Sequence, residues 1–220
     1  MEMLFERLRL WRDDQPRSGP DNMAVDEWLM KSVGDTAVLR LYSWAGNWVS
    51  LGYFQSLAEA REIFGDDPEY VRRWTGGGIV DHRNDLTYTL VIPRGHVLAG
   101  NRGNESYCAI HREIARCLGE GGIACDLTPK DSTNESAACF EKPVAWDLLG
   151  DDGQKLAGAG QRRSRWGVLH QGSVMAGVGA LDQLSSFLSG CCEEFVPKER
   201  ESWEELVPKF ASVDWLKRVS

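Results

Sequence analysis

Three consecutive glycines stand between an arginine and a histidine, in a stretch whose residue types could bind an anion or a carbonyl oxygen. Arg73 precedes Gly76, Gly77 and Gly78, and His82 follows them. Glycine reaches positive φ without strain and lets a ligand approach the backbone closely. Successive N–H groups in such a bend form a concavity that attracts phosphate or carbonyl oxygen. A glycine-rich hairpin with a charged edge is the alternative interpretation.

A second candidate is a lysine at the edge of a strand that has almost no side-chain bulk. Lys155 precedes the segment Ala157–Gly160, which contains only alanine and glycine. The lack of bulk lets something else lie against this strip, and a lysine at its edge can point into a pocket. A surface lysine beside a strand weakened by glycine is the alternative.

The cysteines show neither a CxxC pair nor the spacing of zinc ligands, so the sequence predicts no metal site. Without a secretory signal the six cysteines are expected to be reduced, and most reduced cysteines pack as small apolar side chains. Cys139 differs because it lies in a short segment, Ser136–Phe140, outside any clear helical or strand pattern. Loops carried on a rigid sheet commonly hold catalytic residues.

Composition limits the remaining possibilities. The 220 residues carry a formal net charge of −8, which argues against nucleic acid or an anionic membrane surface as a partner. The sequence shows no signal peptide and no apolar run of membrane-spanning length, which indicates a cytoplasmic protein. With 42% hydrophobic residues and no repeat or convincing linker, residues 1–220 are expected to form one catalytic domain.

The elements expected to position these residues alternate irregularly between strands and helices. A helix beginning at Asp21 or Asn22 should end near Ser32. Two strands, Val38–Trp44 and Trp48–Tyr53, are expected to form a hairpin around the turn at residues 45–47.

The clearest helix is expected over Asn104–Leu118, because its apolar residues follow helical spacing and glycines come after it. On this helix His111 is expected at the solvated surface. Farther along the chain, Gln154–Arg162 and Val168–Met175 are expected to pair as a hairpin or meander.

Five segments then carry a family likeness, in this order: Asn22–Glu27, Leu51–Gln55, Arg72–His82, Lys155–Arg162 and Gly172–Ser173. Together they resemble the superfamily of lipoate–protein ligases, octanoyltransferases and biotin ligases over about residues 20–176. The resemblance implies an α/β fold like that of the biotin/lipoate ligase catalytic domain. Its sheet would be mixed and largely antiparallel, with helices on one side.

The resemblance also implies a role in protein lipoylation, by one of two routes. A ligase activates free lipoate with ATP and Mg, whereas a transferase takes an octanoyl or lipoyl group from acyl carrier protein as a thioester and needs no cofactor. Ser136–Phe140 resembles the Ala-Cys-Phe segment of the cysteine-dependent octanoyltransferases, and Trp146-Asp147 replaces the Asn-Asp pair usual in ligases. The chain also ends at Ser220, with little room for the accessory domain of many ligases. We therefore favour the transferase.

Two further alternatives stay open. A non-catalytic lipoyl- or acyl-binding protein would keep the pocket but would tolerate loss of Cys139 and Lys155. A biotin ligase would carry a different Gly-Arg-Gly-rich sequence at the first loop, which the stretch Arg73–Gly78 does not match.

The roles that the resemblance implies follow the chemistry of an acyl group. Cys139 would be the nucleophile, and Lys155 would hydrogen-bond the acyl carbonyl and favour the thiolate. The acyl group would be bound by the other matching residues, namely Arg73, Gly76, Gly77, Gly78, His82, Gly158 and Ala159. Its acceptor would be a lysine of a lipoyl domain.

The chain departs from the family pattern at one strand position. Relatives often have a histidine where this chain has Gln171, and adjacent strand residues face opposite sides of a sheet. A role for His170 is therefore doubtful.

Because acyl carrier proteins and lipoyl domains are generally acidic, docking would need a local basic patch on this acidic chain. Arg162, Arg163 and Arg165 form the best candidate cluster.

Overall fold

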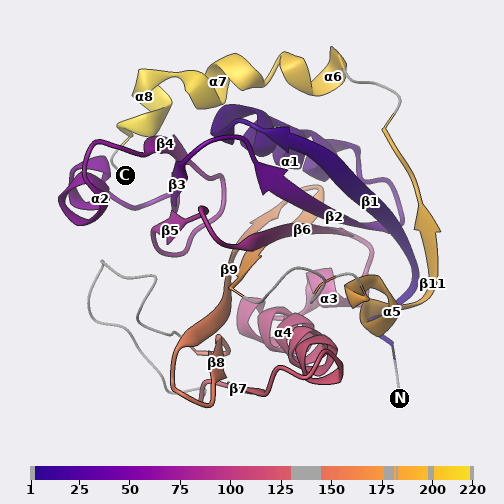
Figure 1. The fold of residues 1–220 in the computed structure, drawn as a ribbon. Coiled ribbons are helices and arrows are strands. Elements are labelled where there is room, and N and C mark those ends of the chain that lie inside the picture. Colours follow the sequence, from indigo (N-terminus) through magenta and orange to yellow (C-terminus); the bar gives the residue numbers. More distant parts are fainter. Residues whose placement is uncertain (1–2, 130–144, 176–180, 182, 198–200, 219–220) are drawn as a thin grey trace.

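The computed structural model of the protein describes residues 3–129, 145–175, 181, 183–197 and 201–218. Its largest element is an eight-stranded mixed sheet (Figure 1). In spatial order the strands are β11 (Ser189–Glu194), β1 (Phe5–Arg17), β2 (Ala37–Trp44), β6 (Leu86–Pro93), β10 (Gly167–Val174), β9 (Lys155–Ser164), β8 (Leu148–Gly150) and β7 (Cys125–Leu127). β1 pairs in parallel with β11 and β2, and every other neighbouring pair is antiparallel. The predicted mixed, largely antiparallel sheet is confirmed.

Helices cover both faces of this sheet, because its central strands are apolar on both sides. In β6, Leu90 packs with α4 (Gly103–Glu120), whereas Val91 packs with α1 (Gly19–Ser32). The helices α3 (Val97–Gly100) and α5 (Leu184–Leu188) lie on the α4 side. The helices α6 (Glu201–Glu204), α7 (Val207–Ala211) and α8 (Val213–Leu216) run along the α1 side (Figure 1). The expectation of helices on one side was therefore wrong.

The ends of the two long helices follow their capping residues. α1 begins after Ser18, whose hydroxyl accepts the Asp21 N–H, so the cap lies three residues before the predicted one. Pro20 fits the first turn because the N–H that it lacks has no partner there. α4 ends at Gly121, as the cluster of glycines predicted.

A second, three-stranded sheet carries the glycine-rich stretch. Its order is β4 (Glu69–Arg72), β3 (Trp48–Leu51) and β5 (Val80–Asp81), and α2 (Leu57–Phe64) packs on it. The predicted hairpin between the strands on either side of residues 45–47 was wrong, because β2 and β3 belong to different sheets. Both edges of β2 are already paired, with β1 and β6, so β3 has no free edge there and pairs elsewhere.

The predicted meander in the second half of the chain is confirmed by the antiparallel order β8–β9–β10. β9 pairs with β10 from Ala157 to Ser164, but β8 pairs with β9 no further than Ala157. Beyond Ala157 no described strand pairs with this edge of β9, and the Ala159 N–H donates to the Tyr107 hydroxyl instead. Within the described part of the chain, no helix is both long and apolar enough to cross a membrane.

Candidate active site

The glycine stretch forms a loop whose carbonyl groups turn inward onto a buried arginine. Arg73 donates to the carbonyls of Gly76 at 3.2 Å and Gly78 at 2.9 Å. It also donates to the Ser50 carbonyl at 3.0 Å and to the Ser50 hydroxyl at 2.6 Å. Burial lowers the pKa of Arg73 to about 10, so the guanidinium stays charged at neutral pH. Arg73 thus holds the loop in shape.

Glycine is required in this loop because the backbone bends and lies close to two other segments. Gly77 has φ +94°, in the left-handed region that side chains disfavour. A Cβ on Gly52 would sit 1.9 Å from the Gly77 carbonyl oxygen, and one on Gly160 would sit 2.2 Å from that of Gly76. Among the described residues, no atom lies within 4 Å of a Cβ position on Gly76 itself. The bend predicted from the three glycines is confirmed, while a concavity of N–H groups that binds an anion or a carbonyl oxygen stays a prediction.

His82 extends the support of the loop. Its Nε2 lies 2.6 Å from the Ser50 Oγ and its Nδ1 lies 2.7 Å from Asp85 Oδ2, while its ring stacks on Trp44 at 4.0 Å. Because the Asp85 carboxylate accepts the Nδ1 proton, Nε2 of the neutral ring is an acceptor, and the Ser50 hydroxyl, which accepts from Arg73, donates to it. The connectivity is that of a Ser–His–Asp triad. Ser50, however, is fully buried, so we assign the three residues to positioning Arg73 and the loop.

Lys155 lies on the same face of β9 as the loop. Its ammonium is 2.8 Å from the Asp147 carboxylate, and its side chain is 11% exposed. A Cβ on Gly158 would sit 2.6 Å from the Lys155 Nζ, so the lysine folds back across its own strand. Residues two apart in a strand share a face and lie about 7 Å apart. Gly158 therefore accommodates Lys155 and Gly160 accommodates the loop, which confirms that other groups lie against the bare strip.

Tyr107 and His111, both on α4, complete the surroundings of Lys155, and sequence reasoning missed them. The Tyr107 hydroxyl donates to Asp147 Oδ1 at 2.6 Å and accepts the Ala159 N–H at 2.9 Å. The His111 ring stacks on Tyr107 at 4.1 Å. The signal was present, because 107 and 111 are four residues apart and share the helix face of Ile110 and Ile114.

The expectation of a solvated His111 was wrong, since the side chain is fully buried. Neither ring nitrogen makes a hydrogen bond of normal geometry within the described residues, and the Trp146 backbone interacts only weakly with the ring. Burial, and next the charge of Lys155, lower the His111 pKa to about 3 against a smaller opposing effect of the Trp146 backbone. His111 is therefore a neutral imidazole beside a cation and a carboxylate.

The strand β10 separates His170 and Gln171 onto opposite faces, as predicted. His170 lies on the α4 side, 2.9 Å from the Tyr88 hydroxyl and 2.9 Å from Gln161 Nε2. Gln171 lies on the α1 side, where it accepts from the Thr75 hydroxyl at 2.7 Å and donates to Asp26 at 2.6 Å. Gln171 thus connects the start of the glycine loop to α1.

Asp26 is the centre of a buried polar cluster behind the loop. Arg40 donates to Asp26 at 2.8 Å and to Asp13 at 2.6 Å, and Tyr42 donates to Asp26 at 3.2 Å. Burial raises the Tyr42 pKa well above its ordinary value, so the hydroxyl remains a donor. This cluster ties α1 to the central strands.

Cys139 lies outside the described residues, so its place beside Lys155 stays a prediction. The arginines of the predicted docking cluster have separate contacts. Arg162 donates to the Trp74 carbonyl and Arg163 to that of Ala99, while Arg165 is exposed beside Trp166.

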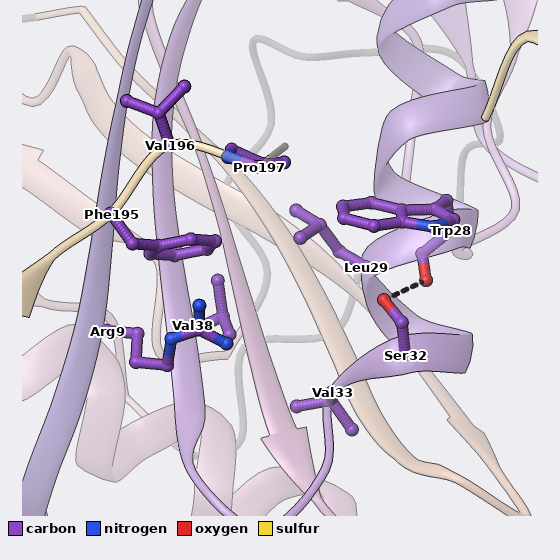
Figure 2. A pocket seen from close by; sticks show the side chains of 9 residues that line it. All are labelled: Arg9, Trp28, Leu29, Ser32, Val33, Val38, Phe195, Val196 and Pro197. Atoms are coloured by element: carbon purple, nitrogen blue, oxygen red, sulfur yellow. Dashed lines mark hydrogen bonds between the residues drawn. The ribbon is translucent and has the colours of Figure 1, made fainter. Parts of the chain in front are cut away.

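A cleft of about 490 Å³ lies on the α1 side of the sheet (Figure 2). Figure 2 shows α1 on one side of it and the segment Phe195–Pro197 on the other, with the Arg9 guanidinium 3.8 Å from the Phe195 ring centre. None of the predicted site residues that the structure describes lines this cleft. It is therefore distinct from the Lys155 site.

The fold is that of the catalytic domain of lipoate–protein ligases. Lipoate-protein ligase A, solved with bound ATP, matches with a TM-score of 0.76 over 96% of this chain and 98% of that chain, at 18% identity. The bipartite lipoate protein ligase of Thermoplasma acidophilum, studied with its E2 lipoyl domain, matches with a TM-score of 0.70 over 96% of each chain, also at 18% identity.

The family follows from the sequence comparison. Residues 18–216 match the lipoyl protein ligase A/B catalytic domain, and the chain belongs to that family. The octanoyltransferase LipM of Symbiobacterium thermophilum is 35% identical over 180 residues, which cover 75% of this chain. The match spans 65% of that protein's own length.

Proposed function

We propose that this protein transfers an octanoyl group from acyl carrier protein to a lysine of a lipoyl domain, through a thioester on Cys139. The observation that carries the proposal is the Lys155 ammonium, held by Asp147 on the face of β9 that the glycine loop also covers. Its similarity to a LipM octanoyltransferase supports the choice of reaction.

The steps balance without an outside cofactor. The Cys139 thiolate attacks the thioester carbonyl of the donor, a new C–S bond forms, and the carrier thiolate leaves. The amine of the acceptor lysine then attacks the Cys139 thioester. An amide forms, the Cys139 thiolate leaves, and the amine gives up one proton.

Lys155 stabilises both steps, because negative charge develops on the carbonyl oxygen each time. The bare glycine face leaves room for the acyl chain at Gly76, where no atom of the described residues lies within 4 Å of a Cβ position. Arg73 and His82 shape that loop, and Gly158 and Ala159 form the opposing strand. Because no step forms an adenylate, the transferase needs neither ATP nor Mg.

The direct test weighs the intact protein after incubation with octanoyl-acyl carrier protein. We expect one added octanoyl mass that hydroxylamine removes, and transfer to a lipoyl domain that Cys139→Ser abolishes. Cys191→Ser is the matched control, because Cys191 is exposed and lies on β11, the far edge strand of the sheet.

Other outcomes would redirect the assignment. Modification of a lipoyl domain only with free lipoate and ATP, at the wild-type rate in Cys139→Ser, would replace the transferase with an ATP- and Mg-dependent ligase. Tight binding of an acyl or lipoyl group, with no covalent product under either condition, would identify a binding protein.

A further inference from the structure

We propose that Tyr107 is a positioning residue that fixes the Asp147 carboxylate and, through it, the Lys155 ammonium. The inference deepens the proposed function, on which its kinetic consequence rests. Nothing in the family motifs of the sequence points to Tyr107, which lies on α4, about fifty residues before Lys155.

The contacts form one continuous chain. The Ala159 N–H donates to the Tyr107 hydroxyl at 2.9 Å, the hydroxyl donates to Asp147 Oδ1 at 2.6 Å, and Asp147 Oδ2 lies 2.8 Å from the Lys155 Nζ. The direction is fixed by chemistry. A peptide N–H can only donate and an ionised carboxylate can only accept, so the single hydroxyl proton must point to Asp147.

The Tyr107 hydroxyl accepts a hydrogen bond from the edge of β9 at a point where β8 no longer pairs with it. β8 pairs with β9 no further than Ala157, so the Ala159 N–H lies beyond the end of β8. A half-buried N–H without a partner destabilises the folded state, and the Tyr107 oxygen supplies the acceptor. The same atom therefore completes the strand edge and orients the carboxylate.

Tyr107 is well held for this task. Its ring stacks on His111 at 4.1 Å and lies 5.4 Å from the His170 ring. Burial, then the charge of Asp147, raise the Tyr107 pKa well above its ordinary value, so the hydroxyl stays protonated. Neutral His111 adds no second cation that would compete for Asp147.

The backbone before Asp147 is also specialised. Trp146 has φ +72°, the one positive φ of a non-glycine residue in the described chain. That conformation is strained for a residue with a Cβ, which crowds the neighbouring backbone. Thr128 holds the turn by donating its N–H to the Asp147 carbonyl at 2.8 Å. The fold thus keeps a strained residue where the chain presents Asp147 to Tyr107.

The kinetic test compares Tyr107→Phe with Tyr42→Phe. The second variant is a matched control, because Tyr42 is buried and donates to a carboxylate, Asp26, that also binds a cation. We expect Tyr107→Phe to lower kcat about tenfold or more with KM for the octanoyl donor nearly unchanged, as for the loss of a hydrogen bond to a charged group. Tyr42→Phe should lower thermal stability about as much as Tyr107→Phe does. Its kcat, however, should stay within about twofold of the wild-type value.

A double-mutant cycle identifies the route of the effect. If Tyr107 acts through Asp147, adding Tyr107→Phe to Asp147→Asn should change kcat by less than about twofold. Independent, multiplying effects of the two substitutions would overturn the proposal.

A second measurement does not depend on the reaction. Lys155 is labelled with succinimidyl acetate, and its rate of acetylation is read from the peptide that contains it. Tyr107→Phe should raise that rate several-fold, because the ammonium is no longer held on an oriented carboxylate, and Tyr42→Phe should not. If the rate rises while wild-type protein transfers no octanoyl group, the positioning role stands and the proposed function fails. If Tyr107→Phe and Tyr42→Phe label alike, Tyr107 is only structural.

Discussion

Two buried carboxylates in this protein have the same kinds of partner, a tyrosine hydroxyl and a basic side chain, but they serve different ends. Asp26 binds Tyr42 and Arg40 between α1 and the central strands. Asp147, the residue directly before β8, binds Tyr107 and Lys155. The cation distinguishes them, because Arg40 is fully buried whereas the Lys155 side chain is 11% exposed.

The difference shows how a fold separates support from chemistry. Arg40 donates in five hydrogen bonds, to Asp13, Asn22 and Asp26, so its planar guanidinium is locked among protein groups. An ammonium on a flexible four-carbon stem can turn its donors toward a substrate carbonyl. Under the proposed function, the Asp26 set fixes the frame and the Asp147 set presents a positive charge to the substrate.

The largest effect is expected when the Asp26 set loses its cation. Arg40→Met leaves Asp26 buried without a positive partner, while Asp13 retains Arg17 at 2.8 Å. Removing one member of a buried ion pair costs about 3–5 kcal/mol, so urea unfolding should show a loss of that size. A loss below about 1 kcal/mol would mean that the set contributes little to the frame.

Two single variants, each replacing one basic residue by the other type, test whether the Asp26 and Asp147 sets need different cations. Lys155→Arg keeps a positive charge for Asp147, but a planar fork does not replace a compact ammonium beside Gly158, so kcat should fall about 100-fold with stability nearly unchanged. Arg40→Lys should do the reverse, lowering stability and sparing kcat. Full activity in Lys155→Arg would remove Lys155 from the reaction.

The pH dependence of stability tests whether His111, which is buried on the Asp147 side, stays neutral in the folded protein. An unfolded histidine has a pKa of about 6.5, and folded His111 has a pKa of about 3. Between these values the unfolded state binds a proton that the folded state does not. Stability is therefore full above pH 6.5 and falls as the pH drops, by about 1.3 kcal/mol between pH 7 and pH 5.5.

His111→Phe should remove that part of the slope, because phenylalanine has no ring nitrogen that can take up a proton in the unfolded state. Urea unfolding at pH 5.5 and 7 measures it, and the other histidines remain the same in both proteins. An equal slope in the two proteins would show that His111 is protonated in the folded state.

The smallest effect is expected at the link between the Asp26 set and the glycine loop. Thr75→Val removes the hydroxyl that donates to Gln171 at 2.7 Å, which should cost about 1 kcal/mol in stability while transfer continues. Thr75→Ser keeps the hydroxyl and serves as the control. A loss of transfer in Thr75→Val without a loss of stability would place the Asp26 set in the reaction.

The sequence alone carried the local features of the site. Three glycines in a row predicted a bend, and Gly77 has φ +94°. The alanine and glycine strip after Lys155 predicted a strand that other groups could lie against. The Lys155 side chain lies against Gly158, and the Gly76 carbonyl lies against Gly160. These features were readable because each depends on the residue itself, on its conformational freedom or its lack of side-chain bulk.

Only the tertiary structure decided which groups meet. No local pattern states that both edges of β2 are taken, so the expected hairpin with β3 could not be excluded beforehand. The periodicity of α4 gave its apolar stripe, but the burial of His111 and the bond from Tyr107 to Asp147 depend on where β8 stops and β9 continues. Hydrogen bonds and burial between residues forty positions apart are set by packing, and a linear pattern reports only the period of each element by itself.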